Sequence, residues 1–152
     1  MSARAASRLV SLGFAHVYRY QAGKADWFAA GLPREGKEAQ VPRVADVAKR
    51  DVATCRLDKR VADVRDRVGA EPMVVLDADR VVLGLVGLDA LTGDPATPIE
   101  QVMDPAPVTF RPNVRAGDVP DYFKKQSVRH AVVTTSDGVL IGLLHLHSME
   151  GA

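Results

Sequence analysis

Hydrophobic residues are concentrated in two stretches that each contain one short polar break. Apolar runs of strand length predict strands buried on both faces, and the polar breaks predict tight turns. Each stretch therefore predicts a β-hairpin. The run, break and run are Met73–Leu76, Asp77–Arg80 and Val81–Leu88 in the first, and Ala131–Thr135, Ser136–Gly138 and Val139–Leu146 in the second.

The two predicted hairpins are copies of one sequence. Residues 74–91 align without a gap with residues 132–149, and a weaker match links residues 53–64 to residues 108–119. A duplication of this length predicts two equivalent units, and two copies are too few for a solenoid. We therefore expect a pair related by pseudo-two-fold symmetry. The identical positions of the longer match are Val74/Val132, Val75/Val133, Asp79/Asp137, Val81/Val139, Gly84/Gly142, Leu85/Leu143 and Leu88/Leu146.

A strand and a helix are expected before each hairpin. Residues 53–57 and 108–111 predict the strands. Asp58 and Asp118 are the expected N-caps of the two helices, and Pro120 falls in the first turn of the second, where proline is tolerated. Short helices are also expected at Val44–Lys49 and Ile99–Met103. The apolar positions of the two main helices are Val61, Val64 and Val68, and Val119, Tyr122 and Phe123.

Residues 1–40 have a different character and do not match the repeat. They predict a helix from Ala3 to Leu12 ended by Gly13, a strand at Val17–Tyr20, a turn at Gly31–Pro33 and a polar linker from Arg34 to Gln40. The predicted organisation is an N-terminal segment (1–40), a first repeat (41–104) and a second repeat (105–152). Five of the eight aromatic residues lie in the N-terminal segment, namely Phe14, Tyr18, Tyr20, Trp27 and Phe28.

Composition narrows the function classes. The chain has 152 residues, 47% of them hydrophobic, and a formal net charge of +1, so it carries no basic footprint for nucleic acid or a membrane surface. A single cysteine excludes an internal disulfide and suits a reducing compartment. No run of eighteen apolar residues occurs, so no transmembrane helix is expected. The acid-free, arginine-bearing first 19 residues weakly resemble a transit peptide, but the cytoplasm is the predicted location.

The duplicated unit resembles the CBS domain. The strand–helix–strand–strand–helix order, the two hairpins with Gly84 and Gly142, and the helix at Val44–Lys49 match that family. Residues 44–149 thus look like a tandem CBS pair. The resemblance implies an α/β fold: two small mixed sheets with helices packed on them, plus the short N-terminal helix and strand. It also implies a non-catalytic regulatory module that forms disc-like homodimers through the apolar helices of the repeats.

The N-terminal segment resembles the last third of a rhodanese domain. The positions that carry the resemblance are Arg4, Leu9, Gly13-Phe14, Val17-Tyr18, Tyr20, Gly23, Asp26-Trp27 and Gly31-Leu32-Pro33. In that family the nucleophilic cysteine lies just before this closing helix, which here starts near Met1. We expect the segment to dock on the repeats, to pair with a partner chain, or to be the end of a longer gene product.

The family resemblance implies a ligand with an adenosyl group, such as AMP, ATP or S-adenosylmethionine, held between the repeats. The family motif is Gly, a hydrophobic residue, any residue, Thr or Ser, two further residues and Asp. Here the hydroxyl and carboxylate positions hold Gly87 and Ala90 in the first copy, and His145 and Ser148 in the second. Both copies depart from the motif, so an alternative remains: a structural or oligomerisation module with ligand-free clefts.

The second copy keeps polar side chains at both motif positions, so its cleft is the predicted site. A histidine there can act as a donor to an anion. The residues predicted to line this cleft are Thr109, His130, Gly142, His145 and Ser148, with Thr54, Gly84 and Asp89 as further candidates from the first copy.

Two other chemistries are not expected. Cys55 aligns with Phe110 on the inward face of a strand, which favours a core residue over a sulfur-transferring nucleophile, so we predict no enzyme activity. His130, His145 and His147 lie on neighbouring strands but lack the cysteine or acidic partners of most transition-metal sites. No bound metal is therefore expected.

Overall fold

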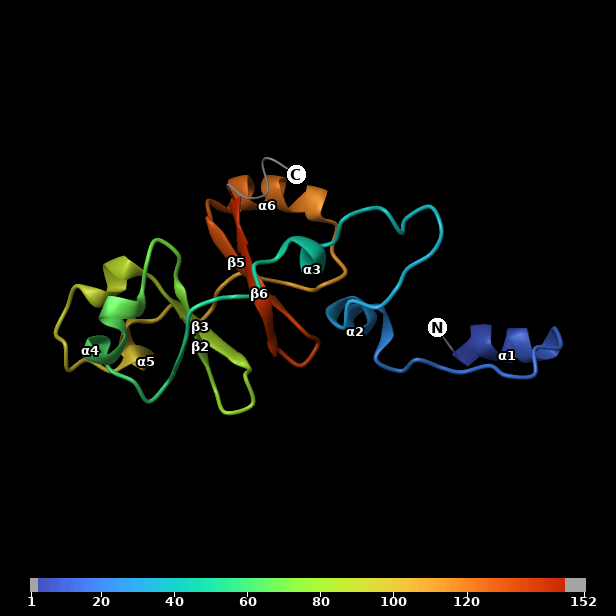
Figure 1. Ribbon diagram of the computed structural model, residues 1–152, viewed down its shortest axis with the longest axis horizontal. Helices are drawn as coiled ribbons and strands as arrows, with labels where there is room; N and C mark the ends of the chain where they lie inside the picture. Colours follow the sequence, from blue (N-terminus) through green and yellow to red (C-terminus); the bar gives the residue numbers. More distant parts are fainter. Residues whose placement is uncertain (1–2, 147–152) are drawn as a thin grey trace.

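The computed structural model describes residues 3–146. Two three-stranded sheets lie next to each other at the centre of the repeat region, with short helices around them (Figure 1). The elements are α1 (Ala3–Ser11), α2 (Gly23–Ala29), α3 (Val44–Val47), β1 (Thr54–Arg56), α4 (Val61–Val64), η1 (Arg65–Arg67), β2 (Met73–Leu76), β3 (Val82–Val86), η2 (Leu88–Leu91), α5 (Ile99–Val102), β4 (Thr109–Phe110), η3 (Ala116–Asp118), α6 (Val119–Gln126), β5 (His130–Thr134) and β6 (Leu140–His145).

The two sheets have the same topology. In the first, β1 pairs with β2 in parallel and β2 pairs with β3 antiparallel; β4, β5 and β6 repeat this pattern. The register shifts at equivalent places, between Val75 and Leu76 and between Val133 and Thr134. The hairpins and the strand before each one are therefore confirmed, as is the duplication.

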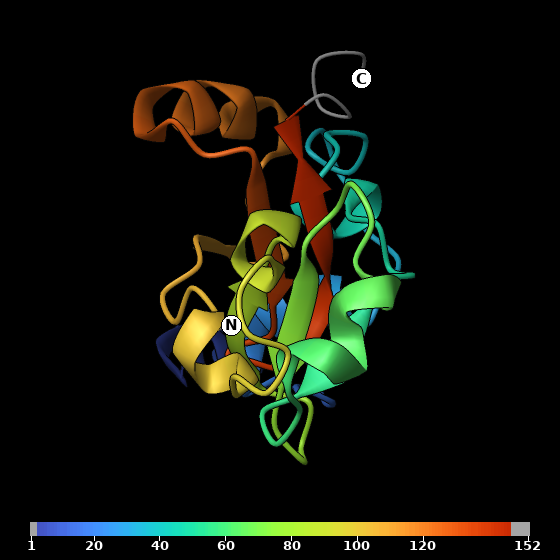
Figure 2. The same ribbon diagram turned by 90° about the vertical axis from the view of Figure 1, so that its left-hand side faces the viewer.

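The central strands β2 and β5 are buried on both faces, as their continuous apolar runs predict. Val74 and Leu76 of β2 pack against Val132, Leu140 and Leu143 of the other sheet. The alternate side chains of β2 point to the opposite face and join the core under α4 and α5. Figure 2 looks along the two sheets and shows their strands running beside each other.

Backbone hydrogen bonds join the tips of the two hairpins. The Val82 N–H donates to the Gly138 carbonyl (3.0 Å), and the Leu140 N–H donates to the Arg80 carbonyl (3.1 Å). Arg80 and Gly138 are equivalent in the two copies, and both adopt positive φ. This reciprocal pairing is the pseudo-two-fold relation that the duplication predicts.

The helices before the two repeats are exchanged between the halves. Val44 of α3 lies in the core of the second sheet, with Val119 and Phe123 of α6. Ile99 of α5 lies in the core of the first sheet, with Val61. Each sheet is therefore covered by the helix that precedes the strands of the other sheet. The repeat boundary at residues 104/105 follows the sequence duplication and remains a prediction.

Two equivalent glycines allow this exchange. The Lys49 N–H and carbonyl bond to Leu143, each at 2.9 Å, and Asp104 pairs with Leu85 in the same way. A Cβ atom at Gly142 would lie 2.6 Å from the Lys49 carbonyl oxygen, and one at Gly84 would lie 2.6 Å from the Asp104 carbonyl oxygen. Gly84 and Gly142 therefore let a connecting segment cross close over the sheet.

The N-terminal segment differs from its prediction in two ways. Helix α1 is present, but Val17–Tyr20 forms no strand, and α2 was not predicted. The segment 17–20 has no partner strand among residues 3–146, and an isolated strand leaves its backbone groups unpaired. In α2, Trp27 donates its indole N–H to the Pro33 carbonyl (2.9 Å), which fixes the turn that follows the helix.

The predicted helix caps and apolar stripes also need correction. Arg60, rather than Asp58, is the N-cap of α4, where its N–H donates to the Asp63 carboxylate (2.9 Å). Asp118 is the N-cap of α6, but its side chain makes no capping bond. The apolar helix residues that were expected to form a dimer interface are buried within the chain, and Tyr122 is the only one of them that is exposed (41%). The buried members are Val61, Val64, Val68, Val119 and Phe123.

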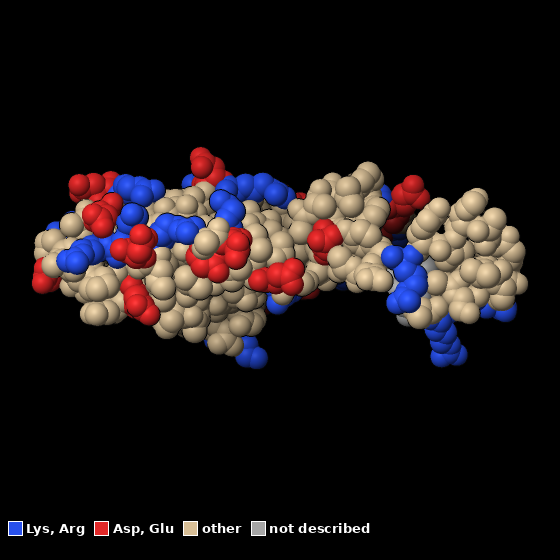
Figure 3. All heavy atoms as spheres, turned by 90° about the horizontal axis from the view of Figure 1, so that it is seen from below, with Lys and Arg blue, Asp and Glu red and all other residues tan. Residues whose placement is uncertain are grey.

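The surface carries no strongly charged face in the view of Figure 3. Acidic and basic side chains alternate over the repeats, whereas the end of the molecule formed by α1 is mostly uncharged with a few basic side chains. No helix within residues 3–146 is long and apolar enough to cross a membrane.

Candidate functional site

The open end of the β5–β6 hairpin brings two histidines together. His130 is the first residue of β5, His145 is the last of β6, and the two are register partners. Their rings meet edge to face with centroids 4.2 Å apart. The sequence prediction that these two side chains share one site is consistent with this geometry.

The first repeat supplies an acid and a base to the same place. Glu71 precedes β2, and its Oε1 atom lies 3.4 Å from Nε2 of His145. Its other carboxylate oxygen accepts a hydrogen bond from Nζ of Lys49 (2.7 Å). Lys49 is placed by its backbone pairing with Leu143 on β6. Lys49, Glu71, His130 and His145, which we call the inter-repeat cluster, thus bridge the two halves.

The charges of the inter-repeat cluster are coupled. The hydrogen bond from Lys49 lowers the pKa of Glu71 below its ordinary value, with smaller contributions from the two histidines. Partial burial lowers the pKa of His130, and the neighbouring His145 lowers it further. At neutral pH the cluster therefore holds an ionised Glu71 and a neutral His130.

His145 retains an unused polar atom. Its Nε2 atom is buried and has no hydrogen-bond partner within residues 3–146, because the contact with Glu71 has the distance of an ion pair without hydrogen-bond geometry. A buried polar atom without a partner costs free energy. An acceptor or donor brought close to His145 would remove that cost.

An open cavity of about 520 Å³ adjoins the inter-repeat cluster. It is lined by Lys49 and residues 51–53, which lead into β1, and by residues 69–71, which lead into β2. Lys49 and Glu71 belong to both the cavity wall and the cluster. The volume is in the range of pockets for metabolite-sized ligands. A group bound in this cavity would therefore lie beside Lys49 and Glu71, and Glu71 links it to His145.

The other residues predicted for the site are scattered. Thr109 lies on β4, which β5 separates from β6, so it is not brought to His145. Thr54 lines a different, smaller cavity of about 210 Å³ beside β1. Asp89 is exposed on η2. Gly84 and Gly142 are occupied by the crossing backbone segments. Ser148 and His147 lie outside the described residues.

Cys55 has the surroundings of a core residue. Cys55 is 6% exposed in the core of the first sheet, and burial raises the pKa of its thiol. A thiol that resists ionisation is a poor nucleophile. In the part of the chain that the structure describes, no group of three His, Cys, Asp or Glu side chains is arranged to hold a metal ion.

Sequence reasoning missed Lys49 and Glu71. Neither belongs to the motif at the end of the third strand. Lys49 joins the cluster because its segment crosses to β6, and Glu71 joins it from the segment before β2. The weaker upstream repeat was a usable signal. It makes Lys49 equivalent to Asp104, the residue that crosses over Gly84 in the other half.

Comparisons with known proteins agree on the fold. The family described as CBS domain matches residues 99–149. No curated protein sequence matches the chain. The cytosolic domain of the Mg²⁺ channel MgtE in complex with ATP superposes with a TM-score of 0.67 at 17% identity. That match covers 73% of this chain and 48% of the channel domain, so the chain spans about half of that relative's length.

Two further solved structures are similar over most of their own length. The CBS domains of a transcriptional regulator from Streptococcus pneumoniae give a TM-score of 0.65 at 17% identity, covering 74% of this chain and 100% of that one. CBSX2 in complex with AMP gives a TM-score of 0.63 at 18% identity, with coverages of 72% and 93%. The fold of this chain is that of a tandem CBS-domain pair.

Proposed function

We propose that this chain is a non-catalytic regulatory module that binds an adenine nucleotide, or a related adenosyl metabolite, beside the inter-repeat cluster. The observation that carries the proposal is the buried Nε2 atom of His145, which makes no hydrogen bond and which Glu71 links to Lys49 and to an open cavity. Further support comes from proteins of the same fold that were solved with ATP or with AMP.

The geometry favours the phosphate of the nucleotide as the group that enters the cluster. Lys49 and His145 both face the carboxylate of Glu71, which acts as their internal anion. A phosphate contacting the same two side chains would replace Glu71 and accept charge-assisted hydrogen bonds. The base and ribose would then occupy the cavity lined by Lys49, residues 51–53 and residues 69–71.

Ribose recognition must differ from the family pattern. Ala90 has no carboxylate to accept hydrogen bonds from the ribose hydroxyls in the first copy, and the second copy has Ser148 at that position. We therefore expect the phosphate contacts to contribute more to affinity than the ribose contacts. This order of contributions favours AMP or ATP over S-adenosylmethionine, which has no phosphate.

A thermal-shift titration with AMP, ATP, NAD and S-adenosylmethionine tests the function. We expect AMP or ATP to raise the unfolding midpoint in a concentration-dependent way, because a ligand that binds only the folded state stabilises it. If none of the four changes the midpoint at millimolar concentration, the chain is better described by the alternative, a structural or oligomerisation module with ligand-free clefts.

The module is also proposed to act as a homodimer in the cytoplasm. The helical stripes first expected at the interface are buried, so the remaining apolar candidates on the repeats are Leu88 (53% exposed) and Tyr122 (41% exposed). A closed two-fold assembly would cover them. Light scattering should give twice the chain mass of 16.4 kDa, and a mass equal to one chain would contradict the dimer.

The relation of residues 1–40 to rhodanese domains stays a prediction. It does not bear on sulfur transfer by the described residues, because Cys55 is the only cysteine of the chain and is buried in a core.

A further inference from the structure

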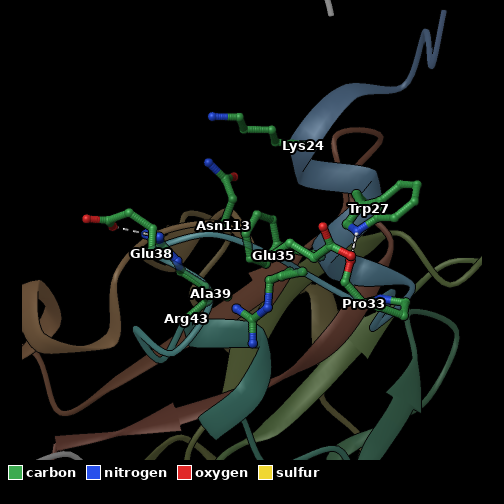
Figure 4. Close-up of a pocket in the computed structure, with 10 residues that line it drawn as sticks. Lys24, Trp27, Pro33, Glu35, Glu38, Ala39, Arg43 and Asn113 are labelled. Carbon is green, nitrogen blue, oxygen red and sulfur yellow. Dashed lines mark hydrogen bonds and ion pairs between the residues drawn. The ribbon is translucent and has the colours of Figure 1, made fainter.

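A second cavity lies away from the inter-repeat cluster, where the N-terminal segment meets the second repeat. It has a volume of about 430 Å³, and its walls come from α2, from the segment that leads to α3, and from Asn113 (Figure 4). Trp27 and Phe28 of α2 form its apolar part. Neither the tandem repeat nor the ligand motif accounts for this cavity.

Two arginines in the wall share one aromatic ring. The guanidinium carbon of Arg34 lies 5.0 Å from the centroid of Phe28, and that of Arg43 lies 5.5 Å from it. Each arginine also has one acidic partner. Arg34 pairs with Asp46 (3.0 Å), and Arg43 pairs with Glu38 (3.2 Å).

The two guanidinium groups are incompletely paired. Nη1 of Arg34 and Nε of Arg43 are buried, and neither has a hydrogen-bond partner among residues 3–146. Glu38, the acidic partner of Arg43, also forms an ion pair with Arg115 (2.9 Å). Arg43 therefore shares this carboxylate with a second arginine. Two buried cationic donors that lack acceptors are expected to attract an oxyanion, because buried polar groups need partners.

The remaining features limit the charge and shape of the ligand. Lys24 adds a third cation to the lining, but Glu35 and Glu38 add two acids, so a single negative charge suits the cavity better than a highly charged phosphate. The Trp27 side chain is held in place by its hydrogen bond to Pro33 and by an edge-to-face contact with Tyr20 at 5.4 Å. A fixed aromatic wall favours a flat apolar body.

We propose that this cavity is a binding site for a small flat monocarboxylate, whose carboxylate group contacts Arg34 and Arg43 and whose body packs on Trp27 and Phe28. The guanidinium fork matches a carboxylate in geometry as well as in charge. The site is independent of the nucleotide proposed above, since it shares no lining residue with the cavity beside the inter-repeat cluster.

Trp27 is the only tryptophan, so its fluorescence reports directly on the cavity. The full chain is titrated with benzoate as the probe, and with benzyl alcohol as a neutral molecule that has the same ring. We expect a saturable change in Trp27 emission with benzoate and a much smaller one with benzyl alcohol. No saturable change with benzoate, or an equal change with both compounds, would overturn the proposal.

Arginine variants test which side chains hold the carboxylate. Arg43→Gln and Arg34→Gln are each expected to weaken benzoate binding by about tenfold, because each removes one charged donor. Arg115→Gln is the matched control, since Arg115 shares Glu38 with Arg43 but does not line the cavity. Circular dichroism identifies any variant that fails to fold. Unchanged affinity in a folded Arg34 or Arg43 variant, or equal losses in Arg115→Gln, would contradict the site.

Discussion

At the scale of single residues, the equivalent glycines of the two repeats have a structural role that the ligand motif does not predict. Gly84 and Gly142 each allow a backbone segment to cross close over a sheet, and their part in ligand binding stays a prediction. His145 was predicted from the motif alone, but its surroundings depend on Lys49 and Glu71, which lie far away in the sequence.

Replacing Glu71 is expected to strengthen nucleotide binding. In Glu71→Gln the internal anion that occupies Lys49 and His145 is removed, so a phosphate no longer has to displace it. We expect AMP affinity to rise by about three- to tenfold by calorimetry. Glu100→Gln, the same change at an exposed position on α5, should leave affinity unchanged. Weaker binding in Glu71→Gln would show that the carboxylate contacts the ligand instead.

Adding a methyl group at Gly142 is expected to destabilise the fold. The new Cβ atom would lie 2.6 Å from the Lys49 carbonyl oxygen, and the crossing segment would have to move. We expect Gly142→Ala to lower the free energy of unfolding by about 1–3 kcal/mol in a denaturant titration. Gly117→Ala is the control, because no atom lies within 4 Å of its new Cβ. Equal stability of the two variants would mean that the crossing is looser than described.

At the scale of elements, the sequence predicts what local pattern controls. The hairpins and the strand before each one follow from apolar runs and from the repeat, and all are present. These patterns do not predict that α3 covers the second sheet and α5 covers the first. A helix of four residues has the same apolar pattern whichever sheet it covers. The expected strand at Val17–Tyr20 is absent for a similar reason. A stable strand needs a neighbouring strand to pair with, and local β propensity does not show whether one is present.

The same limit applies to the candidate site. The motif on β6 located His145, and the register of β5 with β6 placed His130 beside it. The rest of the inter-repeat cluster comes from segments that precede β1 and β2, so its composition depends on how the two halves pack. Thr109 lies on β4, which β5 separates from β6, and its place in the binding cleft stays a prediction.

His130, at the open end of the β5–β6 hairpin, is expected to make the free energy of unfolding depend on pH. Burial lowers the pKa of His130 below its ordinary value of 6.5 in the folded state, with His145 and Arg129 acting in the same direction and Glu71 opposing them. The unfolded chain therefore binds the proton more readily. The stability that His130 contributes is present above pH 6.5 and is lost as pH falls through 6.5 towards the lower folded pKa.

Denaturant unfolding at pH 7.5 and pH 5.5 checks this dependence, since the two values lie on either side of the ordinary histidine pKa. His130→Gln should lose less stability than the wild type between these two conditions, because the neutral amide does not titrate. His16→Gln changes an exposed histidine of the N-terminal segment and serves as the control. An identical pH response in wild type and His130→Gln would contradict the assignment.

At the scale of the whole molecule, the chain is a symmetric pair of sheets with an N-terminal extension. The three hydrophobic clusters contain buried residues from Val44 onwards and none from α1 or α2. The extension is linked to the repeats through ion pairs of partly exposed side chains, Arg34 with Asp46 and Glu38 with Arg43 and Arg115. Its large apolar side chains remain exposed, among them Phe14 (58%) and Tyr18 (83%).

A chain that begins at residue 41 is therefore expected to fold. Exposed ion pairs contribute little stability, so the thermal unfolding midpoint should fall by less than about 5 °C relative to the full chain. The shortened chain should also retain any response to AMP. A fall of more than about 10 °C would show that the extension belongs to the core of the folded unit.

Calorimetric titration of AMP into wild type and His145→Ala tests whether an adenine nucleotide binds beside His145. We expect wild type to bind and His145→Ala to bind about five- to tenfold more weakly, because the variant loses the Nε2 atom that would contact the phosphate. His16→Ala should bind like the wild type. Equal AMP affinity of wild type and His145→Ala would contradict the site.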